Sequence, residues 1–190
     1  MAGRKRVGVL ALQGDFEAHR RALERVGAEA VEVRSAGELE GVQGLIIPGG
    51  ESTTMVKLLE EEKLLDPLRD FGRRRPIFGT CAGAILLATE VANSPQASLG
   101  LMDMEVERNA YGRQLDSRIA HLNPQGMDGG LEAVFIRAPM IRRVGADARV
   151  LATYEGNPVL VEQGLHLAAT FHPELTDDPR VHLIFLQKIP

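Results

Sequence analysis

The chain has 190 residues, of which 44% are hydrophobic and 25% are charged, and its formal net charge is −4 at pH 7. These values are typical of one soluble domain with its own core, and no apolar run approaches the roughly 18 residues that a membrane span needs. The negative charge gives no electrostatic reason to expect nucleic acid or an anionic membrane as a partner. The N-terminal segment lacks the pattern of a signal peptide and the single cysteine cannot form an internal disulfide, so the cytoplasm is the expected location.

The chain begins with two short β-rich runs on either side of a helical pattern. Residues 7–12 and 30–33 are predicted strands. Between them, apolar residues recur at helical spacing from Phe16 to Val26, and Gly27 is the expected C-terminal glycine of that helix.

The same alternation continues through the next part of the chain. Strands are predicted at 44–48 and 76–79, and helices at 53–65 and 82–92. Strands that alternate with helices in this way are typical of a mostly parallel sheet with helices on both faces.

The second half of the chain differs, because its β-rich runs are separated by turns that contain glycine. Residues 148–154, 158–162 and 165–171 are therefore predicted to form antiparallel hairpins near the far end of the sheet. The sequence shows no internal repeat or second domain. We expect a single domain over residues 1–190, of the α/β class, with an open, mostly parallel sheet and some antiparallel hairpin strands in the second half.

The only cysteine of the chain lies in the segment Gly79-Thr80-Cys81-Ala82-Gly83, between a predicted strand and a predicted helix. This is the pattern of a nucleophile elbow, a strand-to-helix turn so tight that its flanking positions require glycine. The carboxyl end of a parallel strand is also where open α/β sheets bind ligands, and a helix N-terminus favours a thiolate. Taken alone, the pentapeptide is equally compatible with a small buried apolar side chain.

A cysteine nucleophile needs a base, and His172 is the best candidate among the histidines. It follows the predicted strand 165–171 and precedes Pro173 and Glu174. In an extended segment, residues two apart project to the same side, so the Glu174 carboxylate is expected to orient the imidazole. His166 and His182 lie in apolar surroundings, which favours a structural role for both.

The glycine pair in Pro48-Gly49-Gly50-Glu51-Ser52 follows another predicted parallel strand, so it is expected at the same sheet edge as Cys81. An acyl-transfer site needs hydrogen-bond donors for an oxyanion. The backbone N–H groups of Gly50 and Ala82 are the candidates, since Ala82 directly follows the nucleophile.

Together these motifs resemble the class I, triad-type glutamine amidotransferases, whose glutaminase domain is a flavodoxin-like open sheet. Further segments resemble the glutaminase subunits of two-component pyridoxal 5′-phosphate synthases, in the family's order and over nearly the whole chain. These segments are LALQGD at 10–15, PGGESTTM at 48–55, FGTCAGAILLA at 78–88, VERNAYGRQLDS at 106–117, VFIRAP at 134–139 and FHPELTDD at 171–178.

The resemblance implies that Cys81 is the nucleophile, His172 the general base and Glu174 its orienting partner. It also implies a set of residues that contact the substrate glutamine: Gly50, Glu51, Ser52, Arg108, Ile136 and Arg137. An arginine suits this role because a guanidinium can hold the carboxylate of a free amino acid in bidentate fashion.

The resemblance further implies that the chain hydrolyses L-glutamine to glutamate and ammonia through a γ-glutamyl thioester, and that the ammonia is passed to a synthase subunit within a large hetero-oligomer. Pyridoxal 5′-phosphate would be the product of the complex and not a cofactor of this subunit, and no metal site is expected. Gln13, in the turn after the first strand, is a candidate for the side that faces the partner. Family members usually continue past Lys188-Ile189-Pro190 with more helix, so the extent of a terminal helix and some of the partner contact stay open.

Two other interpretations remain at this stage. One keeps the triad in a free-standing γ-glutamyl hydrolase or related cysteine hydrolase, which would be active without any partner. The other makes Cys81 a redox-sensing thiol on a flavodoxin-like binding module. A flavin or nucleotide role is less supported, because no glycine-rich phosphate loop follows the first strand.

Overall fold

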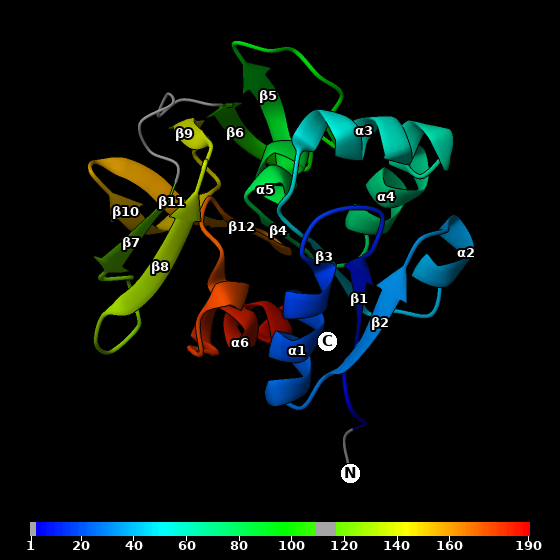
Figure 1. Ribbon diagram of the computed structural model, residues 1–190, viewed down its shortest axis with the longest axis horizontal. Helices are drawn as coiled ribbons and strands as arrows, with labels where there is room; N and C mark the ends of the chain where they lie inside the picture. Colours follow the sequence, from blue (N-terminus) through cyan, green and yellow to red (C-terminus); the bar gives the residue numbers. More distant parts are fainter. Residues whose placement is uncertain (1–2, 109–116) are drawn as a thin grey trace.

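The computed structural model describes residues 3–108 and 117–190, and its centre is a seven-stranded sheet (Figure 1). The strand order is β10-β11-β12-β4-β3-β1-β2. Five neighbouring strands are parallel: β1 (Arg6–Leu10), β2 (Glu29–Val33), β3 (Gly44–Ile47), β4 (Ile77–Thr80) and β12 (His166–Ala169). Their order across the sheet is that of the flavodoxin-like fold, so the predicted fold class is confirmed.

Antiparallel strands complete one edge of this sheet. β10 (Arg149–Tyr154) pairs with β11 (Asn157–Gln163), and β11 pairs with β12, which confirms the predicted hairpins. Two smaller sheets lie beside them: β5 (Ala88–Ala92), β6 (Met102–Glu107) and β9 (Met140–Val144) form one, and the hairpin of β7 (Ser117–Leu122) and β8 (Leu131–Ile136) forms the other.

Helices cover both faces of the large sheet (Figure 1). α1 (Phe16–Arg25) and α6 (Arg180–Gln187) pack on one face, against a cluster that includes Ile46 and Phe78. The other face carries α2 (Ala36–Leu39), α3 (Ser52–Glu61), α4 (Leu65–Gly72) and α5 (Ala82–Leu87). Because both faces are buried, all residues of β3 and β4 are buried, which explains their continuous apolar runs.

The predicted ends of α1 agree with the structure. The Asp15 side chain accepts a hydrogen bond from the Ala18 backbone N–H at 3.2 Å and so caps the first turn. Gly27 has a φ of +81°, the left-handed conformation expected of a glycine after a helix.

Two helix predictions were wrong in extent. The predicted helix 53–65 corresponds to α3, which ends at Glu61; Lys63, whose φ is +54°, interrupts the helical run before α4 begins at Leu65. The predicted helix 82–92 ends at Leu87, and the residues that follow form β5, which pairs in parallel with β6. β5 carries β-branched Thr89 and Val91, and pairing with β6, the next strand in the chain, outweighs the local helical pattern.

A terminal helix is present as α6. Lys5 holds its end, because Nζ donates hydrogen bonds to the carbonyl oxygens of Leu186 at 2.9 Å and Ile189 at 2.6 Å. Over the residues described, no helix combines the length and apolar character that crossing a membrane requires.

Candidate active site

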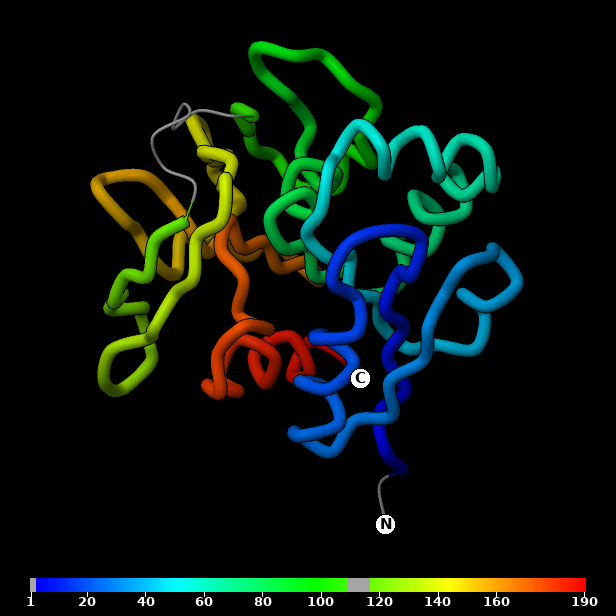
Figure 2. The backbone as a smooth tube through the Cα atoms, in the orientation of Figure 1, coloured from blue at the N-terminus to red at the C-terminus, as the bar shows by residue number. Residues whose placement is uncertain are grey.

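The candidate site lies at the carboxyl ends of the parallel strands, where the loops after β1, β3, β4 and β12 converge. The loops after β1 and β3 run side by side (Figure 2). A Cβ added to Gly14 would lie only 1.8 Å from the carbonyl oxygen of Gly49. Close backbone approach therefore requires glycine at position 14, whose φ is +91°.

Cys81 occupies the predicted elbow between β4 and α5. Its φ of +50° and ψ of −106° are unusual for a residue with a side chain, and its backbone N–H donates to Ala169 O at 2.8 Å. The flanking glycines are sterically required: a Cβ at Gly79 would lie 2.4 Å from Gly83 O, and a Cβ at Gly83 would lie 2.1 Å from Ile47 O. The turn therefore presents the sulfur at the sheet edge with strained backbone geometry.

His172 and Glu174 form a direct hydrogen bond, in which Nδ1 of the imidazole and Oε1 of the carboxylate are 2.7 Å apart. The prediction of an extended segment here was wrong, because Pro173–Leu175 form the 3₁₀ turn η1, with His172 at its N-terminus. Pro173, with its fixed φ and missing N–H, fits the first position of such a turn. The turn brings the two side chains together as the extended segment was expected to do.

Electrostatics favour the charged forms of this pair. Burial lowers the pKa of His172, but interactions with Cys81 and Glu174 outweigh it and raise this pKa to about 10. Burial raises the pKa of Glu174, but His19 and His172 outweigh it, so the net shift is downward. A protonated His172 beside Cys81 is the environment that stabilises a thiolate.

Cys81 and His172 line a cavity of about 330 Å³. The cavity also brings together all the residues predicted to bind glutamine or an oxyanion: Gly50, Glu51, Ser52, Ala82, Arg108, Ile136 and Arg137. Sequence reasoning missed two further lining residues, Ile85 and Pro139. Ile85 lies four residues after Cys81 on α5, so helical spacing could have placed it on the same face.

Arg108 is held at the cavity by two contacts. Its Nη1 donates to Ser94 Oγ at 2.9 Å, and its Nη2 donates to Oε1 of Glu51 at 3.3 Å. The carboxylate of Glu51 also caps α3, since it accepts from the backbone N–H of Thr54 at 2.7 Å. Hydrogen bonds from Thr53 and Thr54 lower the pKa of Glu51 to about 2, and the hydrogen bond from the Thr53 side chain has the largest effect. Glu51 is therefore ionised at neutral pH and positions the guanidinium.

The remaining lining residues contribute backbone and hydroxyl groups. The Ile136 carbonyl oxygen lies 3.9 Å from Sγ of Cys81, and Arg137 follows with a φ of +45°. Ser52 donates its hydroxyl hydrogen to Oε1 of Gln96 at 3.0 Å. Ala82 is the first residue of α5, so its N–H has no intrahelical acceptor. Part of the motif at 106–117 falls at 109–116, outside the described residues.

Gln13 and Glu174 lie behind the cavity and do not line it. Gln13 packs against the glycine pair: a Cβ added to Gly50 would lie 2.0 Å from its Nε2. Within the described part of the chain, its buried Oε1 has no hydrogen-bond partner.

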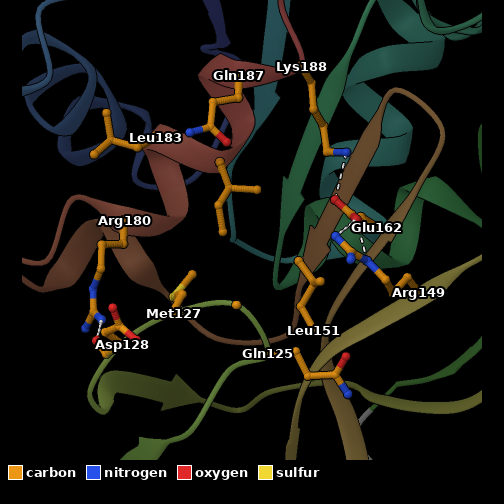
Figure 3. Close-up of a pocket in the computed structure, with 12 residues that line it drawn as sticks. Gln125, Met127, Asp128, Arg149, Leu151, Glu162, Arg180, Leu183, Gln187 and Lys188 are labelled. Atoms are coloured by element: carbon orange, nitrogen blue, oxygen red, sulfur yellow. Dashed lines mark hydrogen bonds and ion pairs between the residues drawn. The ribbon is translucent and has the colours of Figure 1, made fainter.

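A larger cavity, of about 860 Å³, lies between α6 and the loop that joins β7 to β8 (Figure 3). Three of its charged residues form ion pairs: Glu162 pairs with Arg149 and with Lys188, the latter at 2.9 Å (Figure 3). It contains none of the residues predicted for the site. Across residues 3–108 and 117–190, no group of three or more His, Cys, Asp or Glu residues is arranged to hold a metal ion.

An open α/β sheet that carries a cysteine elbow beside a buried histidine–carboxylate pair defines an arrangement suited to acyl transfer through a thiol. The chain belongs to the SNO glutamine amidotransferase family, whose model matches residues 9–190. This match confirms the predicted family and class of enzyme.

Individual relatives agree with the family. The chain is 61% identical over 191 residues to "Pyridoxal 5′-phosphate synthase subunit PdxT" of Solibacter usitatus (strain Ellin6076), with 97% of this chain and all of the relative covered (100%). A solved structure described as a glutamine amidotransferase superposes with a TM-score of 0.91 at 52% identity, over 96% of this chain and 97% of the other. A glutamine amidotransferase from Thermotoga maritima, at 14% identity and a TM-score of 0.63 over 98% of this chain and 90% of the other, shares the fold.

Proposed function

We propose that this chain hydrolyses L-glutamine to glutamate and ammonia through Cys81, His172 and Glu174. The observation that carries the proposal is that Cys81 and His172 line one cavity together with Arg108, while Glu174 is hydrogen-bonded to His172 from behind it. A cavity of about 330 Å³ is of the size that small-molecule sites have.

The substrate is held by charge at one end. The Arg108 guanidinium binds the α-carboxylate of glutamine, and the Glu51 carboxylate lies near enough to pair with the α-ammonium group. Gly50, Ser52, Ile136 and Arg137 complete the walls. The side-chain carboxamide then points toward Cys81.

The reaction proceeds in two halves. The Cys81 thiolate attacks the carboxamide carbon, and the N–H groups of Gly50 and Ala82 stabilise the tetrahedral oxyanion. His172 protonates the leaving nitrogen, the C–N bond breaks, and ammonia departs from a γ-glutamyl thioester. His172 then takes a proton from water, which hydrolyses the thioester to glutamate and regenerates the thiolate.

The ammonia has a defined destination in this proposal. Because relatives that are 61% and 55% identical are named subunits of pyridoxal 5′-phosphate synthase, we place this chain as the glutaminase domain of such an enzyme. A synthase subunit in a hetero-oligomer receives the ammonia and makes pyridoxal 5′-phosphate, which is a product and not a cofactor of this chain. Gln13, against the Gly50 loop, lies on the side through which the partner acts. The cytoplasm is the proposed location.

The test is glutamate release from glutamine by the purified chain, alone and with the synthase subunit, with Cys81→Ala as the control. Release that needs the partner and disappears in Cys81→Ala is the expected result. Equal turnover without a partner would favour a free-standing hydrolase. No release in either case would contradict glutaminase activity and favour a redox-sensing thiol.

A further inference from the structure

Behind the candidate triad lies a buried pair of histidines from the two helices on one face of the sheet. His19 of α1 is fully buried, and His182 of α6 is 1% exposed. Nδ1 of His19 and Nε2 of His182 are 3.1 Å apart, and Nε2 of His19 is 3.0 Å from Oγ1 of Thr80. Phe78 closes the cluster with edge-on contacts to both rings. Close packing therefore fixes the positions of both imidazole rings.

The His19 ring also faces the back of Glu174. Oε1 of Glu174 is bonded to His172, and Oε2 points the other way, where Nε2 of His19 is 3.3 Å distant. Within the part of the chain that the structure describes, Oε2 is buried and has no hydrogen bond of regular geometry. His19 is thus placed to compensate a buried carboxylate oxygen, which is costly to leave unpaired.

One arrangement of protons fits these contacts. If Nε2 of His182 donates to Nδ1 of His19, then His19 carries its proton on Nε2, the atom that faces Thr80 and Glu174. The opposite arrangement would place an imidazole lone pair against the carboxylate and leave the buried Nδ1–H of His182 without an acceptor. Charge and hydrogen bonding therefore favour an Nε2–H on His19 directed at this region.

We propose that His19 is a positioning residue for the catalytic carboxylate: its Nε2–H edge holds Oε2 of Glu174, which keeps Oε1 aligned with Nδ1 of His172. This inference rests on the proposed function. Because the same nitrogen contacts Thr80, which directly precedes Cys81, His19 also links the nucleophile strand to the turn that carries the base.

His19 acts as a neutral ring in this role. Burial lowers the pKa of His19. Burial, and to a lesser extent the neighbouring His19, lowers the pKa of His182 to about 3. The titratable groups that face His19 are His182 on α6, Glu174 on η1, His172 ahead of it and Asp15 before α1. A neutral N–H donor stabilises the Glu174 carboxylate by a hydrogen bond and leaves His172 as its cationic partner.

The experiment compares His19→Gln with His19→Asn, because the two amides differ in reach. The glutamine amide nitrogen reaches the position of Nε2, whereas the asparagine amide ends near Nδ1 and cannot reach Oε2. His166→Phe is the matched control: His166 is another buried histidine, bonded to Ile77 N at 3.2 Å, at the opposite end of β12 from Ala169, which contacts Cys81.

Two quantities are measured for each variant. The first is kcat and KM for glutamine hydrolysis with the synthase subunit present. The second is the pH dependence of Cys81 alkylation by iodoacetamide, which reports the thiolate–imidazolium pair whether or not the chain is a glutaminase. Cys81 is the only cysteine of the chain, so the label reads one site.

His19→Asn is expected to lower kcat about tenfold with little change in KM, and to move the midpoint of alkylation about one unit toward higher pH. His19→Gln is expected to restore both, and His166→Phe to lower only the unfolding temperature. Identical alkylation profiles for His19→Asn and His19→Gln would overturn the proposal, as would a loss of stability alone in both. If the unaltered chain released no glutamate, the proposed function would fail, while the alkylation profiles would still decide the role of His19.

Discussion

Gly49 lies directly against the imidazole of His172: a Cβ added at Gly49 would be 2.5 Å from Cε1 of the ring and 3.1 Å from Cβ of Cys81. The loop that carries the candidate oxyanion donors is therefore packed against both the proposed base and the proposed nucleophile. The geometry of the site therefore requires a residue without a Cβ at position 49.

Gly49→Ala is expected to reduce glutamate release at least a hundredfold, because the imidazole must move away from the thiolate. Gly37→Ala is the matched control, since nothing lies within 4 Å of a Cβ at Gly37, in α2. That control should keep its activity and gain about 0.5–1 kcal/mol of stability. Full activity in Gly49→Ala would show that the loop moves freely relative to His172.

Arg108→Lys is expected to raise the KM for glutamine about tenfold and to change kcat much less. A lysine keeps the charge but cannot hold a carboxylate through two parallel hydrogen bonds. Steady-state kinetics with the synthase subunit present measure this, and Arg149→Lys, in the second cavity, is the control. A fall in kcat at unchanged KM would argue against a substrate-binding role for Arg108.

The pKa of His172, raised from 6.5 to about 10, predicts how stability depends on pH. Because the folded pKa exceeds the unfolded one, the protonated imidazole stabilises the fold fully below pH 6.5, and this contribution is lost as the pH rises through about 10. Glu174→Gln removes a negative partner, so it should lower the pKa of His172. NMR titration of the imidazole measures this shift.

His166 provides an internal reference in the same titration. Burial lowers its pKa to about 4, and it lies away from Glu174, so Glu174→Gln should leave its signal unchanged. An unaltered His172 titration in Glu174→Gln would mean that Cys81 alone sets the protonation state of the base.

Cys81→Gly is expected to be more stable than Cys81→Ala, and both variants are expected to be inactive. A side chain at φ +50° and ψ −106° costs on the order of 1–3 kcal/mol, and glycine relieves this strain at an entropic cost of about 0.5–1 kcal/mol. The net gain of about 1 kcal/mol corresponds to roughly 2–4 °C in Tm for a chain of this size. Differential scanning calorimetry of the two variants would disprove the strain if their Tm values coincided.

Gln13→Ala is expected to lower the ratio of turnover with the synthase subunit to turnover without it. The Gln13 side chain fills the space beside the Gly50 Cα, so its removal loosens the loop through which the partner would act. Gln43→Ala, at the amino end of β3 and bonded to Arg6 N at 2.8 Å, is the control. An unchanged ratio in Gln13→Ala would remove this residue from the coupling between subunits.

Local patterns were sufficient for the parts of the fold that depend on nearby residues. The strands β1 to β4, α1 with Gly27 and the elbow at Cys81 follow from periodicity and glycine sterics, which act over a few residues. The parallel pairing of β12 with β4 was not predicted, since residues 165–171 were expected only in an antiparallel hairpin. The extent of α5 could not be predicted, because residues 88–92 gain more from pairing with β6 than from continuing a helix. The 3₁₀ turn at Pro173–Leu175 was likewise missed, since an X-Pro pair is compatible with both an extended segment and a turn.

Sequence motifs were enough to predict the family and most of the cavity residues, because those residues lie in short motifs at strand ends; Ile85 and Pro139 were not predicted. The residues behind that cavity are brought together by tertiary packing. His19, His182 and Thr80 belong to segments far apart in the chain, and no local pattern relates them to Glu174. A buried carboxylate is stabilised by whatever the packed core brings to it, and packing is a property of the folded chain as a whole.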